Sequence, residues 1–186
     1  MTEDLRLKRK YTLRAHDRQM VFTKKPFESS IHVLTKAFIW ALYLPEYPRL
    51  AVEAPVGDRY KPDLVQFDDN GEPIFWGEAG QVSLKKMRAL VRRFKSTHLV
   101  FAKWHMKLDP FRKILKNEIV SICRSAPVDL ISIPDDSDER FIGRDGVIRI
   151  KFKDVHHVRC SSNSHQCAVP TSPLNGPTIS FVIHPP

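Results

Sequence analysis

Two apolar segments joined by an Asn-Gly dipeptide constrain the fold of this 186-residue chain more than any other feature. They lie in residues 61–80, KPDLVQFDDNGEPIFWGEAG. Asn-Gly between alternating apolar residues predicts a β-hairpin, because a type I′ turn needs a positive φ at both central residues. With Asn70 and Gly71 as those residues, Val65 faces Trp76, Phe67 faces Ile74, and the side chains form one apolar face.

Two acidic residues, Asp63 and Glu78, face each other at the open end of this predicted hairpin. Directly paired side chains have Cβ atoms about 4.5–5.5 Å apart, so two carboxylates there repel each other. A cation or a shared proton relieves the repulsion. Since Mg²⁺ is held by one or two carboxylates together with water and substrate phosphate, the pair is a candidate metal site. The alternatives are a register slip or a bulge that leaves one acid on the surface, and an ion pair with Arg59 or Lys61.

The charge balance favours a polyanionic partner. The chain has 30 Lys and Arg against 21 Asp and Glu, a formal net charge of +9. This excess suits nucleic acid, although a solvated basic surface explains it equally simply. Three cysteines do not form a disulfide framework. The N-terminal sequence MTEDLRLKRK has no signal-peptide core, and no window approaches the roughly 18 apolar residues of a membrane span, so we expect a cytoplasmic protein.

The segments before the hairpin predict two short strands and a helix. The strands lie around residues 11–13 and 20–23. Pro26 and Glu28 suit the first turn of a helix that Pro45 ends, since proline fits that turn and an acid complements the helix dipole. The apolar residues at helical spacing, expected to be buried, are Phe27, Ile31, Leu34, Phe38 and Leu42.

The segments after the hairpin alternate between helix and strand. Ser83 is a plausible N-cap for a basic helix with Leu84 and Met87 facing inward. A buried strand, THLVFAKW, follows, then a helix over about residues 109–124 and the strand VDLISIP. Asp145-Gly146 then turns the chain into an alternating segment, GVIRIKF, that predicts a last strand.

Residues 1–154 are therefore expected to form one domain, and residues 155–186 a poorly ordered tail rich in Ser and Pro. A competing interpretation of the tail is a zinc site. Its His and Cys residues are suitable ligands, but their spacing matches neither the C-x2-C nor the H-x3-5-H pattern of tetrahedral sites.

The motifs, taken in order, resemble the PD-(D/E)XK nuclease superfamily and, more closely, its YaeQ branch. The resemblance covers roughly residues 8–153. It is carried by KPFES at residues 25–29, by P-D at 62–63, by FWGEAG before a basic helix, and by RDGVIRI at 144–150. It implies an α/β, restriction-endonuclease-like core of helix, three strands, helix and strand over residues 26–103, with a mixed central sheet flanked by helices.

The resemblance also implies roles for single residues. Glu28, Asp63 and Glu78 would form an acidic cluster, with Asp63 and Glu78 as ligands of Mg²⁺ or Mn²⁺, although Glu28 is equally well explained as a helix N-terminal charge. Active nucleases of the superfamily carry a lysine two residues after the second acid. This chain has Gly80 there, as the YaeQ pattern does, and glycine cannot stabilise a hydroxide or a pentacovalent phosphorane.

A cation or a water-orienting group would have to come from another residue. By the predicted register one lysine lies opposite Gly80, two open the following helix, and a nearby glutamine could orient a water. Each is also explained as an ordinary surface residue. These four candidates are Lys61, Lys85, Lys86 and Gln81.

The sequence thus predicts a metal-dependent hydrolase of phosphodiester bonds in nucleic acid. The alternative is a catalytically inactive nuclease-fold protein that binds nucleic acid or a protein partner. A third possibility is a structural role, which would give no salt-dependent affinity for polyanions.

Overall fold

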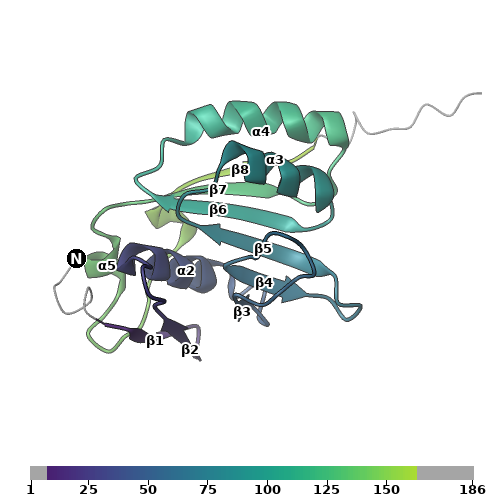
Figure 1. Cartoon of the computed structure of the whole chain (residues 1–186). Coiled ribbons are helices and arrows are strands. Elements are labelled where there is room, and N and C mark those ends of the chain that lie inside the picture. Colours follow the sequence, from purple (N-terminus) through teal and green to yellow (C-terminus); the bar gives the residue numbers. More distant parts are fainter. Residues whose placement is uncertain (1–7, 163–186) are drawn as a thin grey trace, which may run out of the picture.

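A single mixed sheet organises the molecule. The computed structural model describes residues 8–162 (Figure 1). Six strands lie in the order β3-β4-β5-β6-β7-β8; the β5–β6 and β6–β7 pairs are parallel and the other pairs are antiparallel. The strands are β3 (Ala51–Val52), β4 (Leu64–Phe67), β5 (Pro73–Ala79), β6 (His98–Trp104), β7 (Val128–Ile133) and β8 (His156–Cys160).

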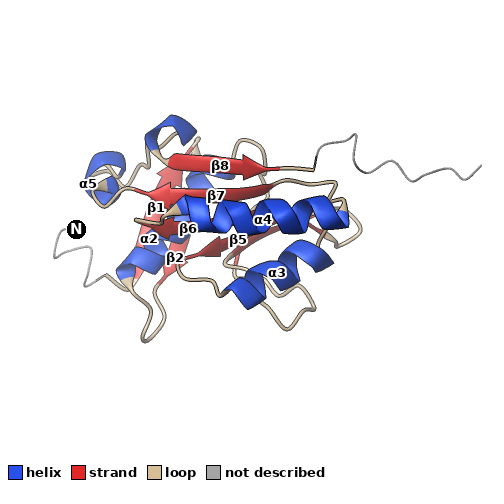
Figure 2. Ribbon diagram, turned by 90° about the horizontal axis from the view of Figure 1, so that it is seen from above, coloured by secondary structure: helices blue, strands red, loops and turns tan. Residues whose placement is uncertain are grey.

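Helices cover both faces of this sheet. One face carries α3 (Leu84–Arg93) and α4 (Leu108–Ile122), which lie over β5, β6 and β7 (Figure 2). The other face carries α2 (Ser30–Tyr43) and, beyond it, the two-stranded sheet of β1 (Lys10–Ala15) and β2 (Arg18–Thr23). The short helix α5 (Ser137–Phe141) packs at the end of this second layer.

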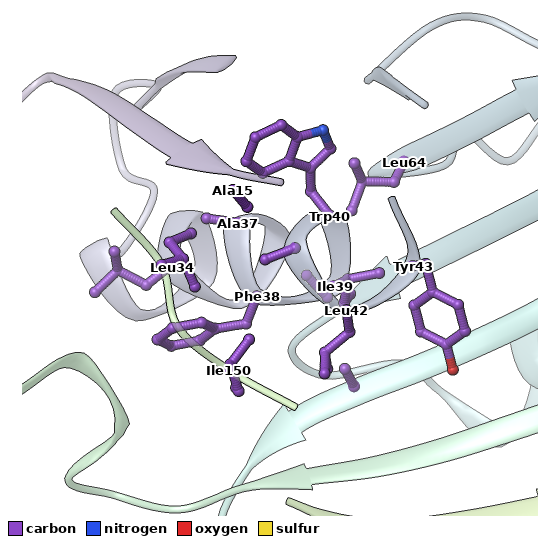
Figure 3. Packing of buried hydrophobic residues seen from close by; sticks show 14 of the residues in the cluster. Ala15, Leu34, Ala37, Phe38, Ile39, Trp40, Leu42, Tyr43, Leu64 and Ile150 are labelled. Carbon is purple, nitrogen blue, oxygen red and sulfur yellow. The ribbon is translucent and has the colours of Figure 1, made fainter. Parts of the chain in front are cut away.

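Helix α2 is the centre of the larger core. All residues from 33 to 43 are buried, because the helix lies between the six-stranded sheet and the β1–β2 pair. Figure 3 shows Trp40 and Phe38 leaving α2 on different sides. Trp40 meets Phe22 of β2 edge to face, with ring centroids 5.9 Å apart. A helix buried on all sides is apolar on most of its surface. Helix α2 follows this rule except at Thr35 and Lys36, whose polar groups are bonded inside the protein.

Much of the expected organisation is confirmed. The sheet is mixed and flanked by helices, and α2, β3, β4, β5, α3 and β6 follow the predicted order of helix, three strands, helix and strand. His16 and Asp17 turn β1 into β2, both with positive φ. The hydroxyl of Ser83 caps α3 by accepting from the Lys86 backbone N–H.

The start of the first long helix was predicted wrongly. Helix α2 begins at Ser30 rather than at Pro26, and Ser29 caps it by accepting from the His32 backbone N–H. Phe27, expected in the buried stripe, is fully exposed and has a φ of 66°, which no helical residue adopts. Glu28 therefore lies outside the helix. Ile31 is also 44% exposed, whereas the later members of the stripe are buried as predicted.

The hairpin turn differs from type I′. Gly71 has a φ of 82°, but Asn70 is not among the residues with positive φ. The turn is built by Asp68, whose carboxylate accepts from the backbone N–H groups of Asn70 and Glu72, and whose carbonyl accepts from the N–H of Gly71. A bulge between Gln66 and the next residue makes Phe67 pair with Pro73 instead of with Ile74. Beyond the bulge the predicted register is confirmed, with Val65 opposite Trp76.

Two predictions about the C-terminal region need correction. The alternating segment GVIRIKF forms isolated bridges, Arg14 with Val147 and Ile142 with Ile148, followed by a 3₁₀ turn at Phe152–Asp154, and not a strand. The tail was placed too early, because residues 156–160 form β8 on the edge of β7. His157 and Arg159 of β8 reach Asp129 of β7, and these contacts give a polar segment a reason to pair. Residues 163–186 lie outside the described part of the chain.

Over residues 8–162, no helix has the length and apolar character that crossing a bilayer requires.

Candidate functional site

Asp63 and Glu78 lie beside each other at the open end of the β4–β5 hairpin. Asp63 immediately precedes β4; its backbone N–H donates to the Gly77 carbonyl at 3.0 Å, and its carboxylate accepts from the Ala79 N–H at 2.7 Å. Those two partners are the residues on either side of Glu78. The predicted register is confirmed as far as Leu64 opposite Gly77, and Asp63 lies one residue beyond it with its N–H bonded to Gly77 rather than to Glu78. The negative charge of Asp63 acts on the carboxyl group of Glu78.

Glu78 is almost completely buried, with 3% of its surface exposed. Its Oε1 accepts from the indole N–H of Trp76 at 2.7 Å, and its Oε2 accepts from the ammonium group of Lys86 at 2.6 Å. Burial raises the pKa of Glu78; the hydrogen bonds from Lys86 and Trp76 oppose that rise, and the charge of Asp63 adds to it. The result is a carboxyl group whose pKa lies above the ordinary range of a glutamate.

Asp63 takes its remaining partner from the opposite layer. Nε2 of His32, in the first turn of α2, lies 3.2 Å from Asp63 Oδ1 and 3.4 Å from Glu28 Oε1. Glu78 by contrast is held by Lys86 of α3. The two neighbouring carboxylates therefore take their partners from helices on opposite faces of the sheet, and this arrangement reduces their mutual repulsion.

His32 also explains why residue 80 is glycine. Gly80 has a φ of 76°, and a Cβ atom added there would lie 3.0 Å from Nδ1 of His32. Both the backbone conformation and the nearness of the imidazole disfavour a side chain. A side chain at this position would require the imidazole of His32 to shift.

Glu28 belongs to a second charged group next to this pair. Lys36 is 1% exposed, and its ammonium group donates to Glu28 at 2.6 Å and to Glu53 at 2.8 Å. Burial alone would lower the pKa of Lys36, but the two carboxylates outweigh it and raise the pKa. Glu53 also pairs with Lys25, and its pKa is lowered because the lysine hydrogen bonds outweigh its own burial. Glu28 and Glu53 are thus neutralised inside the protein.

A pocket of about 470 Å³ opens above these residues. Its lining includes Asp63, Glu28 and His32 on the acidic side, and Phe27 and Lys61 at exposed positions. Asp63 is therefore reachable from solvent, with a lysine beside it.

The four residues predicted to supply a cation or to orient a water lie in different places. Lys86 contacts Glu78, and Lys61 lines the pocket beside Asp63. Lys85 is exposed on α3 and takes part in none of the contacts described for the two acids. Gln81 is also exposed; with Gly80 it lines a separate pocket of about 200 Å³ that includes Lys103 of β6.

Few side chains of the described residues are placed to bind a metal ion. Within residues 8–162, no group of three or more His, Cys, Asp and Glu side chains is arranged to hold a metal ion. Glu28 accordingly does not join Asp63 and Glu78 in such a group, since Lys36 holds it. A site for Mg²⁺ would therefore rest on Asp63 and Glu78 alone; Mg²⁺ keeps several waters and often takes only one or two protein carboxylates.

Sequence reasoning missed several residues of the site. His32 and Lys36 follow the predicted Glu28 at intervals of four residues, and this spacing was visible in the sequence. Glu53 gave no such signal, because it reaches Lys36 only through the pairing of the preceding strand β3 with β4.

Comparison with known proteins addresses the fold. No protein-family model and no curated protein sequence matches the chain. Among solved structures it is similar to a YaeQ protein from Xanthomonas axonopodis pv. citri, with a TM-score of 0.50 and 18% identity over 76% of this chain and 81% of that chain. A YaeQ protein from Pseudomonas syringae aligns with a TM-score of 0.47 and 16% identity, over 84% of this chain and 94% of that chain. The first likeness shows that this chain has a YaeQ-like fold, as its motifs predicted.

Proposed function

We propose that this protein is a Mg²⁺- or Mn²⁺-dependent nuclease that hydrolyses phosphodiester bonds in nucleic acid. The observation that carries the proposal is the juxtaposition of Asp63 and Glu78 at the hairpin mouth, with Lys86 hydrogen-bonded to Glu78. A net charge of +9 suits a polyanionic substrate, and the YaeQ-like fold agrees with the resemblance from which these roles were taken.

In this proposal the two carboxylates hold the ion and Lys86 supplies the positive charge. A bound divalent ion polarises the phosphate and lowers the pKa of a coordinated water. Lys86 lies 2.6 Å from Glu78, so its ammonium group would stand beside the ion and would offset negative charge at the reacting phosphate. Lys61, exposed beside Asp63, is placed to contact a flanking phosphate.

The decisive experiment measures cleavage and ion binding in isosteric variants. Asp63→Asn and Glu78→Gln keep the size of each side chain and remove its charge. We expect the parent protein to cleave labelled DNA or RNA with Mn²⁺, and either variant to lose at least about a hundredfold in rate while keeping its melting temperature within a few degrees. Weaker Mn²⁺ binding by calorimetry should accompany the loss.

Asp69→Asn is the matched control. Asp69 lies at the other end of the same hairpin and its side chain is 90% exposed, so the change removes the same charge away from the site. Its cleavage rate should equal that of the parent. A parent protein that binds no Mn²⁺ and cleaves neither nucleic acid would reject the proposal.

A second function is favoured by one observation: both acids already have partners inside the protein. Lys86 binds Glu78, and the Ala79 N–H and His32 bind Asp63, so an ion has to compete with groups already in place. A protein that binds nucleic acid without cutting it would have this arrangement. Salt-dependent binding that survives Asp63→Asn and Glu78→Gln, with no cleavage by the parent, would identify it.

A further inference from the structure

Phe27 is an aromatic residue that the fold leaves uncovered. It is the most exposed of the large apolar residues, at 108% of the reference exposure, whereas the next, Val21, is 48% exposed. Within residues 8–162, its ring takes part in none of the aromatic or cation–π contacts. A single exposed apolar residue is common on protein surfaces, so the position of the ring and its backbone, and not its exposure alone, carry the argument.

The backbone at Phe27 is also unfavourable. The Glu28 N–H donates to the Lys25 carbonyl at 3.1 Å, which closes a turn with Pro26 first and Phe27 second of its central residues. Proline followed by a residue of positive φ is the pattern of a type II turn, whose second central position is normally glycine. Phe27 holds a φ of 66° there, a strained conformation for a bulky side chain.

The charged network of the site imposes this strain. Glu28 Oε2 accepts from the Lys25 backbone N–H at 2.8 Å, and Glu28 Oε1 is held by the buried ammonium group of Lys36. The two ends of the turn are therefore fixed by the same carboxylate. As a result the ring of Phe27 is held outward at the edge of the pocket that contains Asp63.

The surroundings of the ring define what it would bind. Lys25 and Lys61 line the same pocket as Phe27, together with the acids Glu28, Glu53 and Asp63. Lys25 is paired with Glu53, so Lys61 is the cation of the pocket that is placed to contact a phosphate next to the ring. Aromatic rings stack on unpaired bases while neighbouring cations track the backbone phosphates, and this combination is how proteins bind single strands without sequence preference. Bases in a duplex are stacked on one another and offer no free face to a ring.

We propose that Phe27 stacks on an unpaired base of a single-stranded nucleic acid whose backbone passes over Asp63. The inference deepens the proposed function by naming the form of its substrate. It makes a prediction of its own, since the stacking depends on neither the ion nor the hydrolysis.

The test compares the affinity of variants for a fluorescent oligothymidylate, measured by anisotropy in EDTA so that cleavage cannot occur. Phe27→Gly should weaken binding about tenfold, in the range that stacking on one base gives. The same change should raise the melting temperature, because glycine adopts the positive φ without strain. Opposite changes in affinity and stability are the signature of a ring kept for binding. Phe27→Trp should keep the affinity.

Two controls make the result specific. Val120→Ala removes a 42% exposed apolar residue from α4 and should leave oligothymidylate affinity unchanged. A duplex of equal length should respond to Phe27→Gly less than twofold. An affinity for oligothymidylate that is unchanged in Phe27→Gly overturns the inference. So does a loss of self-association in that variant by sedimentation without a change in affinity, since the ring would then cover a second copy of the chain.

The inference and the proposed function can fail separately. Phe27-dependent binding of the single strand without any Mn²⁺-dependent cleavage would reject the nuclease and leave the stacking site standing. Cleavage that requires Asp63 and Glu78 but shows no dependence on Phe27 would reject the stacking site alone.

Discussion

At the scale of single residues, Gly80 shows how the site differs from that of a lysine-containing nuclease. Its φ of 76° and the 3.0 Å distance to His32 both oppose a side chain. We expect Gly80→Lys to lower the free energy of unfolding by about 1–3 kcal/mol, the cost of a strained backbone conformation, and not to raise any cleavage rate. Urea denaturation measures the first effect and Mn²⁺-dependent cleavage the second.

Adding His32→Ala to Gly80→Lys separates the effect of the close imidazole from the effect of the backbone conformation. Removing the imidazole relieves the contact but leaves the positive φ, so the double variant should recover only part of the lost stability. Full recovery would mean that space alone, and not the backbone, requires the glycine.

Lys86 is the residue on which the proposed chemistry depends. Its ammonium group neutralises Glu78 and opposes the rise of that group's pKa. Lys86→Met keeps the length of the side chain and removes the charge. We expect the cleavage rate to fall by about 10²–10³, the usual effect of losing a group that stabilises developing charge.

Mn²⁺ affinity should respond differently to the same change. With its competing cation removed, Glu78 should bind Mn²⁺ at least as tightly at pH 8, although its pKa should rise further. Lys85→Met, one residue earlier on α3 and exposed, is the matched control and should match the parent in both assays. Equal loss of Mn²⁺ binding and cleavage in Lys86→Met would show that this lysine acts only through the fold.

At the scale of elements, the first turns of α2 join the fold to the site. The helix presents His32 to Asp63 and Lys36 to Glu28 and Glu53, and it buries an ammonium group among carboxylates that are themselves 10% and 18% exposed. Breaking a buried pair by removing one partner is costly because the other charge remains uncompensated.

Lys36→Met should therefore lower the free energy of unfolding by about 3 kcal/mol. The loss should be smaller than for a fully enclosed pair, because Lys25 still neutralises Glu53. Adding Glu28→Gln and Glu53→Gln to Lys36→Met should restore much of the stability, as removing a whole buried ion group often does. If the triple variant is less stable than Lys36→Met alone, the carboxylates have other stabilising contacts.

Sequence reasoning identified elements better than it identified their ends. The apolar segments that became β6, β7 and α4 were recognised because each is long and strongly patterned. The start of α2 was misplaced because Pro26 and Glu28 fit a helix N-terminus locally, whereas the Lys36–Glu28 contact draws this segment into a turn. The local helix propensity of residues 26–28 carries no information about a contact with a residue eight positions further along the chain.

At the scale of the whole molecule, the sequence analysis missed contacts between segments that lie far apart in the chain. The hairpin register from Leu64 to Gln66 followed from residues close in sequence. Strand β8 did not, because its reason to pair lies in Asp129, about thirty residues earlier. Glu53 also reaches Lys36 only through strand pairing. Contacts within a hairpin were predictable, and contacts between distant strands were not.

A different charged group, centred on Asp129, lies at the opposite end of the sheet from the candidate site and stabilises the fold. The carboxyl ends of β5 and β6 lie at the edge that carries Glu78 and Gly80, the edge at which open α/β sheets bind ligands. Asp129 and His98 lie near the other ends of β7 and β6. Asp129 is fully buried and accepts from Tyr43, His98 and Arg159 at 2.6, 2.9 and 2.8 Å.

This group predicts how the stability of the molecule depends on pH. Burial alone would raise the pKa of Asp129, but the hydrogen bonds from Arg159, His157, His98 and Tyr43 outweigh it and hold the pKa far below its ordinary value. A depressed pKa gives stability that is present above the unfolded-state pKa, about 4, and is lost as the pH falls towards the folded-state pKa. Because the group joins α2, β6, β7 and β8, the loss should affect the whole molecule.

Asp129→Asn should lower the free energy of unfolding at pH 7 by about 2–3 kcal/mol, since it removes hydrogen bonds to a charged acceptor. The difference from the parent should shrink between pH 5 and pH 2, where the parent loses the same contribution by protonation. Urea denaturation across this range measures it, with the exposed Asp135→Asn as a control that should follow the parent throughout. A difference that stays constant with pH would mean that Asp129 stabilises the fold through its shape and neutral hydrogen bonds rather than through its charge.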